Sequence, residues 1–137
     1  MNTPISQLIS IFDKLPDQQA DALLTRLAAE NPFAAMKIIQ RHFGFDDLVF
    51  ADDLGIGLLF ESVPETRLHA ALSGADEALL KRFVDQLGTG RARTFIADVD
   101  SWDGPAAIQE AARRTVLVKA MMLHRRGQLR MSRPGID

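Results

Sequence analysis

The sequence has no cysteine, no tyrosine and a single tryptophan among its 137 residues. The lack of cysteine excludes disulfide bonds, thiolate metal ligands and thiol catalysis. The sequence also lacks any apolar run of about 18 residues, so we expect no membrane-spanning helix. Its N-terminal stretch has no basic segment followed by an apolar core, which argues against a secretory signal and favours a bacterial cytoplasmic location. The remaining composition, 47% hydrophobic and 25% charged, is typical of one globular domain of this length.

Charge is unevenly distributed along the chain. Residues 1–105 carry 9 basic and 16 acidic side chains, whereas residues 106–137 carry 7 basic and 2 acidic ones. A basic C-terminal segment is compatible with an anionic partner, but it also suits a helix C-terminus that packs on an acidic neighbour. Because the segment has no interleaved aromatic residues to stack on bases, we favour the second interpretation and expect no nucleic-acid partner.

Helix start and stop signals punctuate the sequence, and apolar residues recur between them at helical spacing. The signals predict three short helices within residues 1–43, and later helices over 64–72, over 76–87, from Thr89, and from Pro105 to about Arg126. No stretch alternates apolar and polar residues long enough to indicate a sheet. The sequence therefore predicts an all-α fold of about seven or eight helices.

The long helix that begins near Pro105 differs from the others because it is apolar nearly all round between Val116 and Leu123. A helix of this kind is buried on more than one side, so we expect it at the centre of its bundle. The predicted core of this part of the chain consists of residues at inward-facing helical positions: Leu79, Phe83, Phe95, Val118 and Met122.

No arrangement of residues in the sequence is typical of an active site. His42, His69 and His124 lie far apart and match no zinc-ligand spacing, and no serine lies in a GxSxG elbow. The segment Gly55-Ile56-Gly57 begins like a dinucleotide fingerprint, but its third glycine is missing and no strand precedes it. We therefore expect no enzymatic activity, no bound metal and no cofactor.

Several short motifs occur in a defined order along the chain. The segment His42-Phe43-Gly44-Phe45 is followed by Asp46-Asp47-Leu48, and Asp52-Asp53 then precedes the next expected helix. Further along are Leu72-Ser73-Gly74-Ala75 and, before the long helix, Gly104-Pro105. In order and spacing these motifs resemble the C-terminal domain of FliG, the flagellar rotor and switch protein. The resemblance covers nearly the whole chain and only the C-terminal part of the family's proteins.

The resemblance implies a short armadillo-like piece of three helices, residues 1–43, followed by a C-terminal helical bundle, residues 44–137. It places a hinge at His42, Phe43, Gly44 and Phe45, where glycine eases rotation of the backbone. It also implies a rotor component at the cytoplasmic face of the inner membrane, without direct membrane insertion. Such a component would bind proteins of the flagellar switch or the stator and have no enzymatic role.

Members of the family produce torque through ionic side chains on one exposed helix that faces the stator. The candidates for such partner-facing charges here have a net charge of zero: Arg91, Arg93, Asp98 and Asp100. Ser73 and Gly90 stand where the family has a lysine and an arginine, and Ala97-Asp98 replaces its acidic pair. Because long-range attraction scales with charge, two functions remain open. The chain is a rotor component, or it is a protein-interaction module that uses the same helical scaffold for a non-motor partner.

Overall fold

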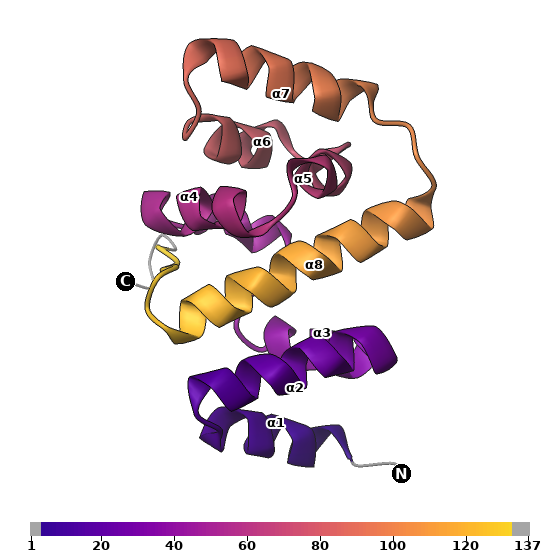
Figure 1. Ribbon diagram of the computed structural model, residues 1–137, viewed down its shortest axis with the longest axis vertical. Helices are drawn as coiled ribbons and strands as arrows, with labels where there is room; N and C mark the ends of the chain where they lie inside the picture. The colour runs from indigo at the N-terminus through magenta and orange to yellow at the C-terminus, as the bar shows by residue number, and fades with distance from the viewer. Residues whose placement is uncertain (1–3, 133–137) are drawn as a thin grey trace.

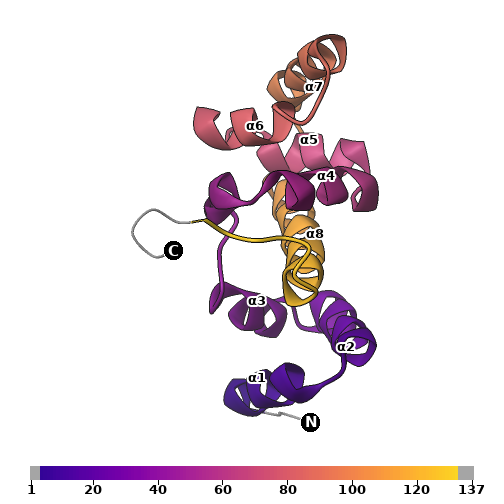
Figure 2. The same ribbon diagram turned by 90° about the vertical axis from the view of Figure 1, so that its left-hand side faces the viewer.

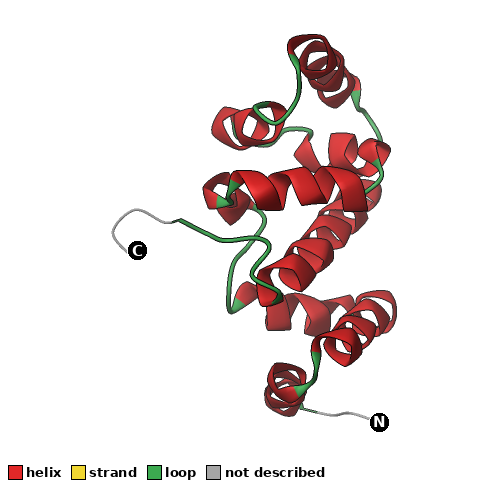
Figure 3. Ribbon diagram, turned by 60° about the vertical axis from the view of Figure 1, so that its left-hand side comes forward, coloured by secondary structure: helices red, strands yellow, loops and turns green. Residues whose placement is uncertain are grey.

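Residues 4–132, the part of the chain that the computed structural model describes, fold into eight α-helices and one 3-10 helix (Figure 3). This part contains no strand, and an isolated antiparallel bridge joins Ala51 to Met131. None of its helices is both long and apolar enough to cross a membrane. The all-α fold that the sequence predicts is confirmed.

The N-terminal piece consists of α1 (Ile5–Lys14), α2 (Asp17–Glu30) and α3 (Pro32–Gln40), which pack on one another at one end of the molecule (Figures 1 and 2). Each helix starts at a proline or directly after one, and the fixed φ of proline suits the first helical turn. The Oδ1 atom of Asn31 also accepts a hydrogen bond from the amide of Ala34 at 3.3 Å and caps α3. These helices lie where the sequence signals predict them.

The other end of the molecule is built from the 3-10 helix η1 (Asp46–Phe50), α4 (Asp53–Ser62), α5 (Glu65–Leu72), α6 (Glu77–Val84) and α7 (Thr89–Ser101). The end of α6 differs from the prediction of a helix over 76–87. The amides of Gln86 and Leu87 bond to carbonyls three residues back, which closes a tight turn in place of a further α-helical turn. Of these helices, α7 lies farthest from the N-terminal piece (Figure 1).

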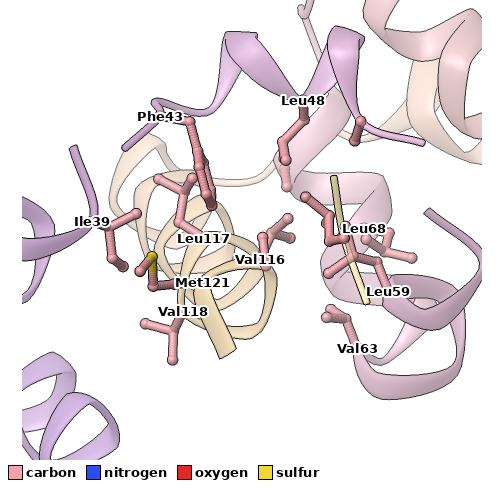
Figure 4. Packing of buried hydrophobic residues seen from close by; sticks show 14 of the residues in the cluster. Ile39, Phe43, Leu48, Leu59, Val63, Leu68, Val116, Leu117, Val118 and Met121 are labelled. Atoms are coloured by element: carbon pink, nitrogen blue, oxygen red, sulfur yellow. The ribbon is translucent and has the colours of Figure 1, made fainter. Parts of the chain in front are cut away.

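The last helix, α8 (Ala106–Arg125), runs between the two ends of the molecule (Figures 1 and 2). It packs against α2 and α3 on one side and against α4 and α5 on the other. In Figure 4, Met121 of α8 lies beside Ile39 of α3, whereas Val116 lies toward Leu68 of α5. The central position predicted for this helix is therefore confirmed.

One hydrophobic cluster extends from α1 through α8 to α7. Four of the predicted core residues are buried in it: Leu79, Phe83, Phe95 and Val118. The prediction for Met122 is wrong, because its side chain is only partly buried against the cluster. Its neighbour Met121, with 2% exposure, occupies the buried face of α8 instead.

Beyond α8 the chain turns at Gly127, where φ is +72°, and returns along η1 and the start of α4. The amide of Asp52 donates a hydrogen bond to the carbonyl of Arg130 at 2.9 Å, and Leu129 is fully buried. Gly55 permits this close approach, since a Cβ atom there would lie 2.5 Å from Cγ of Leu129. The segment that follows α8 is thus hydrogen-bonded to the start of α4 and packed against it.

Candidate functional site

The motif Leu72-Ser73-Gly74-Ala75 forms the end of α5, and side chains of α8 bind it. Gly74 has φ +73°, which L side chains rarely adopt, and this conformation reverses the chain toward α6. From α8, Nε2 of Gln109 donates to the carbonyl of Ser73 at 2.7 Å, and Nε of Arg113 donates to that of Ala71 at 2.9 Å. These bonds satisfy carbonyl groups that a helix end leaves without partners. The motif is therefore a structural joint between α5 and α8.

The motif Gly104-Pro105 lies where the chain passes from α7 to α8. A Cβ atom on Gly104 would lie 2.6 Å from Cζ2 of Trp102, so only glycine admits the indole ring at this position. Pro105 is the residue directly before α8, as expected for a proline at a helix start. Together the two residues position the half-buried Trp102 and the first turn of α8.

The aromatic rings of the predicted hinge both contact α8. Phe43 has 2% exposure, and its ring meets the ring of His124 edge-on with centroids 5.5 Å apart. The half-buried Phe45 lies under Arg113, whose guanidinium carbon is 5.0 Å from the ring centroid. The segment between α3 and η1 is therefore anchored to the central helix on both sides of Gly44.

Gly44 itself has an ordinary backbone conformation without a positive φ. Its amide donates to Oδ2 of Asp47 at 2.8 Å, and an added Cβ atom would lie 3.8 Å from that oxygen, an ordinary contact. This arrangement of the helices therefore does not require glycine at position 44.

His42 lies beside the same joint, with its ring centroid 5.6 Å from that of His124. Partial burial, followed by the charges of Arg41 and His124, lowers the pKa of His42 from its ordinary value, against a smaller opposing effect of Asp13. The surroundings of His42 thus favour its neutral form.

The predicted partner-facing charges lie on α7, but they do not share one face. Residues seven apart on a helix lie on one stripe, whereas residues two apart point in different directions. Arg91 and Asp98 therefore form one stripe, and Arg93 and Asp100 form another.

The first of these stripes is paired with α5. Arg91 forms an exposed ion pair with Glu65 at 3.4 Å, and Asp98 lies 3.7 Å from Nε2 of His69. Within residues 4–132, Arg93 and Asp100 form no ion pair, and both are exposed. The second stripe is thus the part of the predicted set that remains available to a partner.

The basic end of α8 binds the N-terminal piece. Nη2 of Arg125 donates to the carbonyl of Leu15 at 2.8 Å and pairs with Asp17 at 3.6 Å, while Arg126 pairs with Asp21. These contacts agree with the interpretation of the basic segment as a helix C-terminus packed on an acidic neighbour.

The described side chains of these sites serve as helix joints and as surface charges. Within residues 4–132, no three side chains of the metal-ligating types lie close enough together to hold a metal ion. His69 is packed edge-on against Phe95, with ring centroids 4.9 Å apart, and belongs to the α5–α7 contact. These side chains therefore join helices or lie at the surface of the described part of the chain.

Sequence reasoning missed four residues that hold these elements together. Gln109 and Arg113 are polar residues four apart in a largely apolar helix, which is a signal for an inward-facing polar pair. Leu129 and Met131 alternate with polar residues after Gly127, which is a signal for an extended, half-buried segment. Both signals were present in the sequence, but the residues that these side chains contact lie far away along the chain.

The fold and these sites define an all-helical interaction scaffold, in which a central helix joins a three-helix piece to a bundle that carries a charged outer helix. The profile of the family described as the FliG C-terminal domain matches residues 25–131, and the chain belongs to this family. The resemblance that the short motifs indicate is confirmed.

Individual relatives agree with this assignment. The chain is 26% identical over 133 residues to the flagellar motor switch protein FliG of Thermotoga maritima, covering 96% of this chain and 39% of the relative. It is 25% identical over 121 residues to FliG of Aquifex aeolicus, covering 86% of this chain and 36% of the relative. A crystal structure of a FliG fragment from H. pylori shares the fold, with a TM-score of 0.63, 19% identity and coverage of 96% of this chain and 59% of that one. The chain thus spans well under half the length of these curated relatives.

Proposed function

We propose that this chain is a non-enzymatic component of the bacterial flagellar motor switch, located at the cytoplasmic face of the inner membrane. The observation that carries the proposal is the family match over residues 25–131. Within this match, the motif Leu72-Ser73-Gly74-Ala75 joins α5 to α8 through hydrogen bonds from Gln109 and Arg113. The proposed partners are other proteins of the switch or of the stator.

The partner-facing surface in this proposal is the outer side of α7. Arg93 and Asp100 carry opposite charges there without ion pairs among residues 4–132, while Arg91 and Asp98 lie at partly exposed pairs with α5. Such a balanced set produces little long-range steering of a charged partner, although it still permits local pairing. We therefore propose that the chain assembles as a rotor part with weak torque-producing charge.

A graft into a motile strain tests this function. When the chain replaces the corresponding domain of that strain's FliG, we expect fluorescently tagged protein to form motor foci without restoring swimming. Adding the charges that the family carries, through Ser73→Lys together with Ala97→Glu, should restore part of the swarm diameter. Ala97 is exposed, and the hydrogen bonds at position 73 use its carbonyl oxygen, so both changes preserve the joint.

Two controls separate assembly from torque in this graft. The exposed pair Ser62→Lys and Ala78→Glu adds the same charges at positions in α4 and α6 and should leave swimming absent. Absence of motor foci for the parent and for every variant would contradict the rotor function. Full swimming by the unmodified graft would contradict the claim of weak torque-producing charge.

We also propose that residues 1–43 and 44–137 rotate relative to each other at His42, Phe43, Gly44 and Phe45. The support is the backbone of Gly44, which has no positive φ here and is free to adopt one in a second arrangement. Replacing Gly44 by alanine adds only the 3.8 Å contact with Asp47 to the present arrangement, so it restricts the alternatives without disturbing the structure shown.

The variant Gly44→Ala should therefore narrow the distribution of distances between the two pieces. The chain has no cysteine, so spin labels can be placed by Lys14→Cys in α1 and Glu61→Cys in α4, both exposed, and measured by pulsed electron paramagnetic resonance. The control Gly88→Ala, where an added Cβ atom meets nothing within 4 Å, lies outside the joint and should leave the distribution unchanged. A distribution that is equally narrow in the parent and in Gly44→Ala would show one rigid body.

A further inference from the structure

One side of α8 is left uncovered between α2 and α5, the two helices that flank it. Along this side lie Ile108, Ala111, Thr115 and Val118, which follow the spacing of a single helix face. They form the floor of two adjoining hollows of about 270 and 330 Å³, which share Ala111. We call these hollows, with their floor and walls, the α8 groove.

The floor of the α8 groove is apolar where it is most accessible. Ile108 is 56% exposed, which is unusual for a large aliphatic side chain, and Trp102 lines the same end of the groove. Ala28 of α2 lines the other end. An apolar floor between two helical walls is the form in which proteins bind an amphipathic helix.

Cations surround this floor, and no described residue lining the two hollows is acidic. Arg114 and Lys119 line one hollow, and within residues 4–132 neither side chain forms an ion pair or a hydrogen bond. Arg67 lines the other and is held over the groove by a hydrogen bond from Nη1 to Oγ1 of Thr115 at 2.9 Å. Elsewhere on the molecule, cations such as Arg82 and Arg126 are paired with carboxylates.

Because its lining holds Arg67, Arg114 and Lys119 and no described acidic residue, the groove is a local positive surface in a chain with a formal net charge of −2. Its chemical complement is a segment with carboxylates along both edges and apolar residues between them. The floor from Ile108 to Val118 matches a helix of about three turns, given a rise of about 1.5 Å per residue. A row of aromatic side chains for stacking bases is absent from the described lining, which disfavours single-stranded nucleic acid.

We propose that the α8 groove binds an acidic amphipathic helix of a partner protein. The apolar stripe of that helix packs on Ile108 and Ala111, and its flanking carboxylates pair with Arg67, Arg114 and Lys119. The proposal does not rest on a role in the motor, because it follows from the groove and its unpaired cations alone.

Peptide binding to the full chain tests the proposal. The probe is a fluorescein-labelled 14-residue peptide with leucine at helical spacing and glutamate on both flanks, about four turns long. Two comparison peptides are a permutation of the same composition without an apolar stripe, and a version with lysine in place of glutamate. We expect fluorescence anisotropy to show saturable binding of the acidic amphipathic peptide, about tenfold tighter than that of either comparison, and weakening as salt rises.

Variants of the groove supply the decisive comparison. Arg114→Glu combined with Lys119→Glu should weaken binding of the acidic peptide about tenfold or more, because electrostatic attraction becomes repulsion. The control Arg26→Glu reverses one cation of α2 that lies outside the groove in an exposed pair with Glu30, and it should leave the affinity unchanged within about twofold. Ile108→Asn, at an exposed position that does not support the fold, should weaken binding through loss of the apolar contact.

Circular dichroism of each variant confirms that it is folded before binding is compared. Equal affinity for the three peptides would overturn the proposal, as would an equal loss in Arg26→Glu and in the double variant. Displacement of the peptide by phosphatidylserine vesicles or by a single-stranded oligonucleotide at lower concentration would overturn it as well, because the groove would then serve another class of ligand.

Discussion

Replacing Phe83 by alanine is expected to lower the free energy of unfolding by about 3–5 kcal/mol. The ring has 0% exposure and meets the ring of Phe60 edge-on at 5.9 Å between centroids, so truncation leaves a cavity that rigid helices cannot fill. Urea unfolding followed by circular dichroism measures the change.

The matched control for this prediction is Phe33→Ala. The ring of Phe33 is 63% exposed, so the same truncation should cost less than about 1 kcal/mol. A loss below about 1 kcal/mol in Phe83→Ala as well would place Phe83 outside the core and contradict the packing of α6.

Two glycines of α4 should respond to alanine in opposite directions. At Gly55 a Cβ atom would lie 2.5 Å from Cγ of Leu129 and 2.8 Å from Oδ1 of Asp52, so Gly55→Ala should destabilise the protein by about 1–3 kcal/mol. At Gly57 an added Cβ atom meets nothing within 4 Å, so Gly57→Ala should stabilise it by about 0.5–1 kcal/mol through higher helix propensity. Thermal unfolding of both variants measures the sign of each change in stability directly.

A double mutant identifies the contact that causes the loss of stability in Gly55→Ala. In a Leu129→Ala background the obstructing side chain is shortened, so adding Gly55→Ala should cost less than it does alone. Hydrogen exchange at the amide of Asp52, which bonds to the carbonyl of Arg130, should also become faster in Gly55→Ala. Strictly additive effects of the two substitutions would show that Cγ of Leu129 and the atoms beyond it do not cause the loss of stability.

The helix positions were predictable because their signals act within a few residues. At the start of α3, Pro32 supplies a helical φ and Asn31 supplies a side-chain cap. After α5, Gly74 reverses the chain through its positive φ. The central place of α8 was also predictable, since an apolar circumference requires neighbours on more than one side. These features depend on the local sequence or on its periodicity alone.

The pairing of side chains between distant elements was not predictable in the same way. Arg91 meets Glu65 only because α7 lies across α5 in a particular register, and no local pattern encodes that register. The same holds for Leu129, whose burial depends on the missing side chain at Gly55. The charged surface of α7 and the fastening of the segment after α8 therefore needed the three-dimensional structure.

The order of the helices along the chain has a consequence for synthesis on the ribosome. Because α8 is the last described helix and packs on both ends of the molecule, α2, α3, α4 and α5 all emerge before the surface that covers them. Their apolar faces stay open to solvent and to chaperones until about the end of α8 has left the exit tunnel. The native core is therefore completed only after α8 has been synthesised, and truncations within α8 should yield aggregation-prone chains.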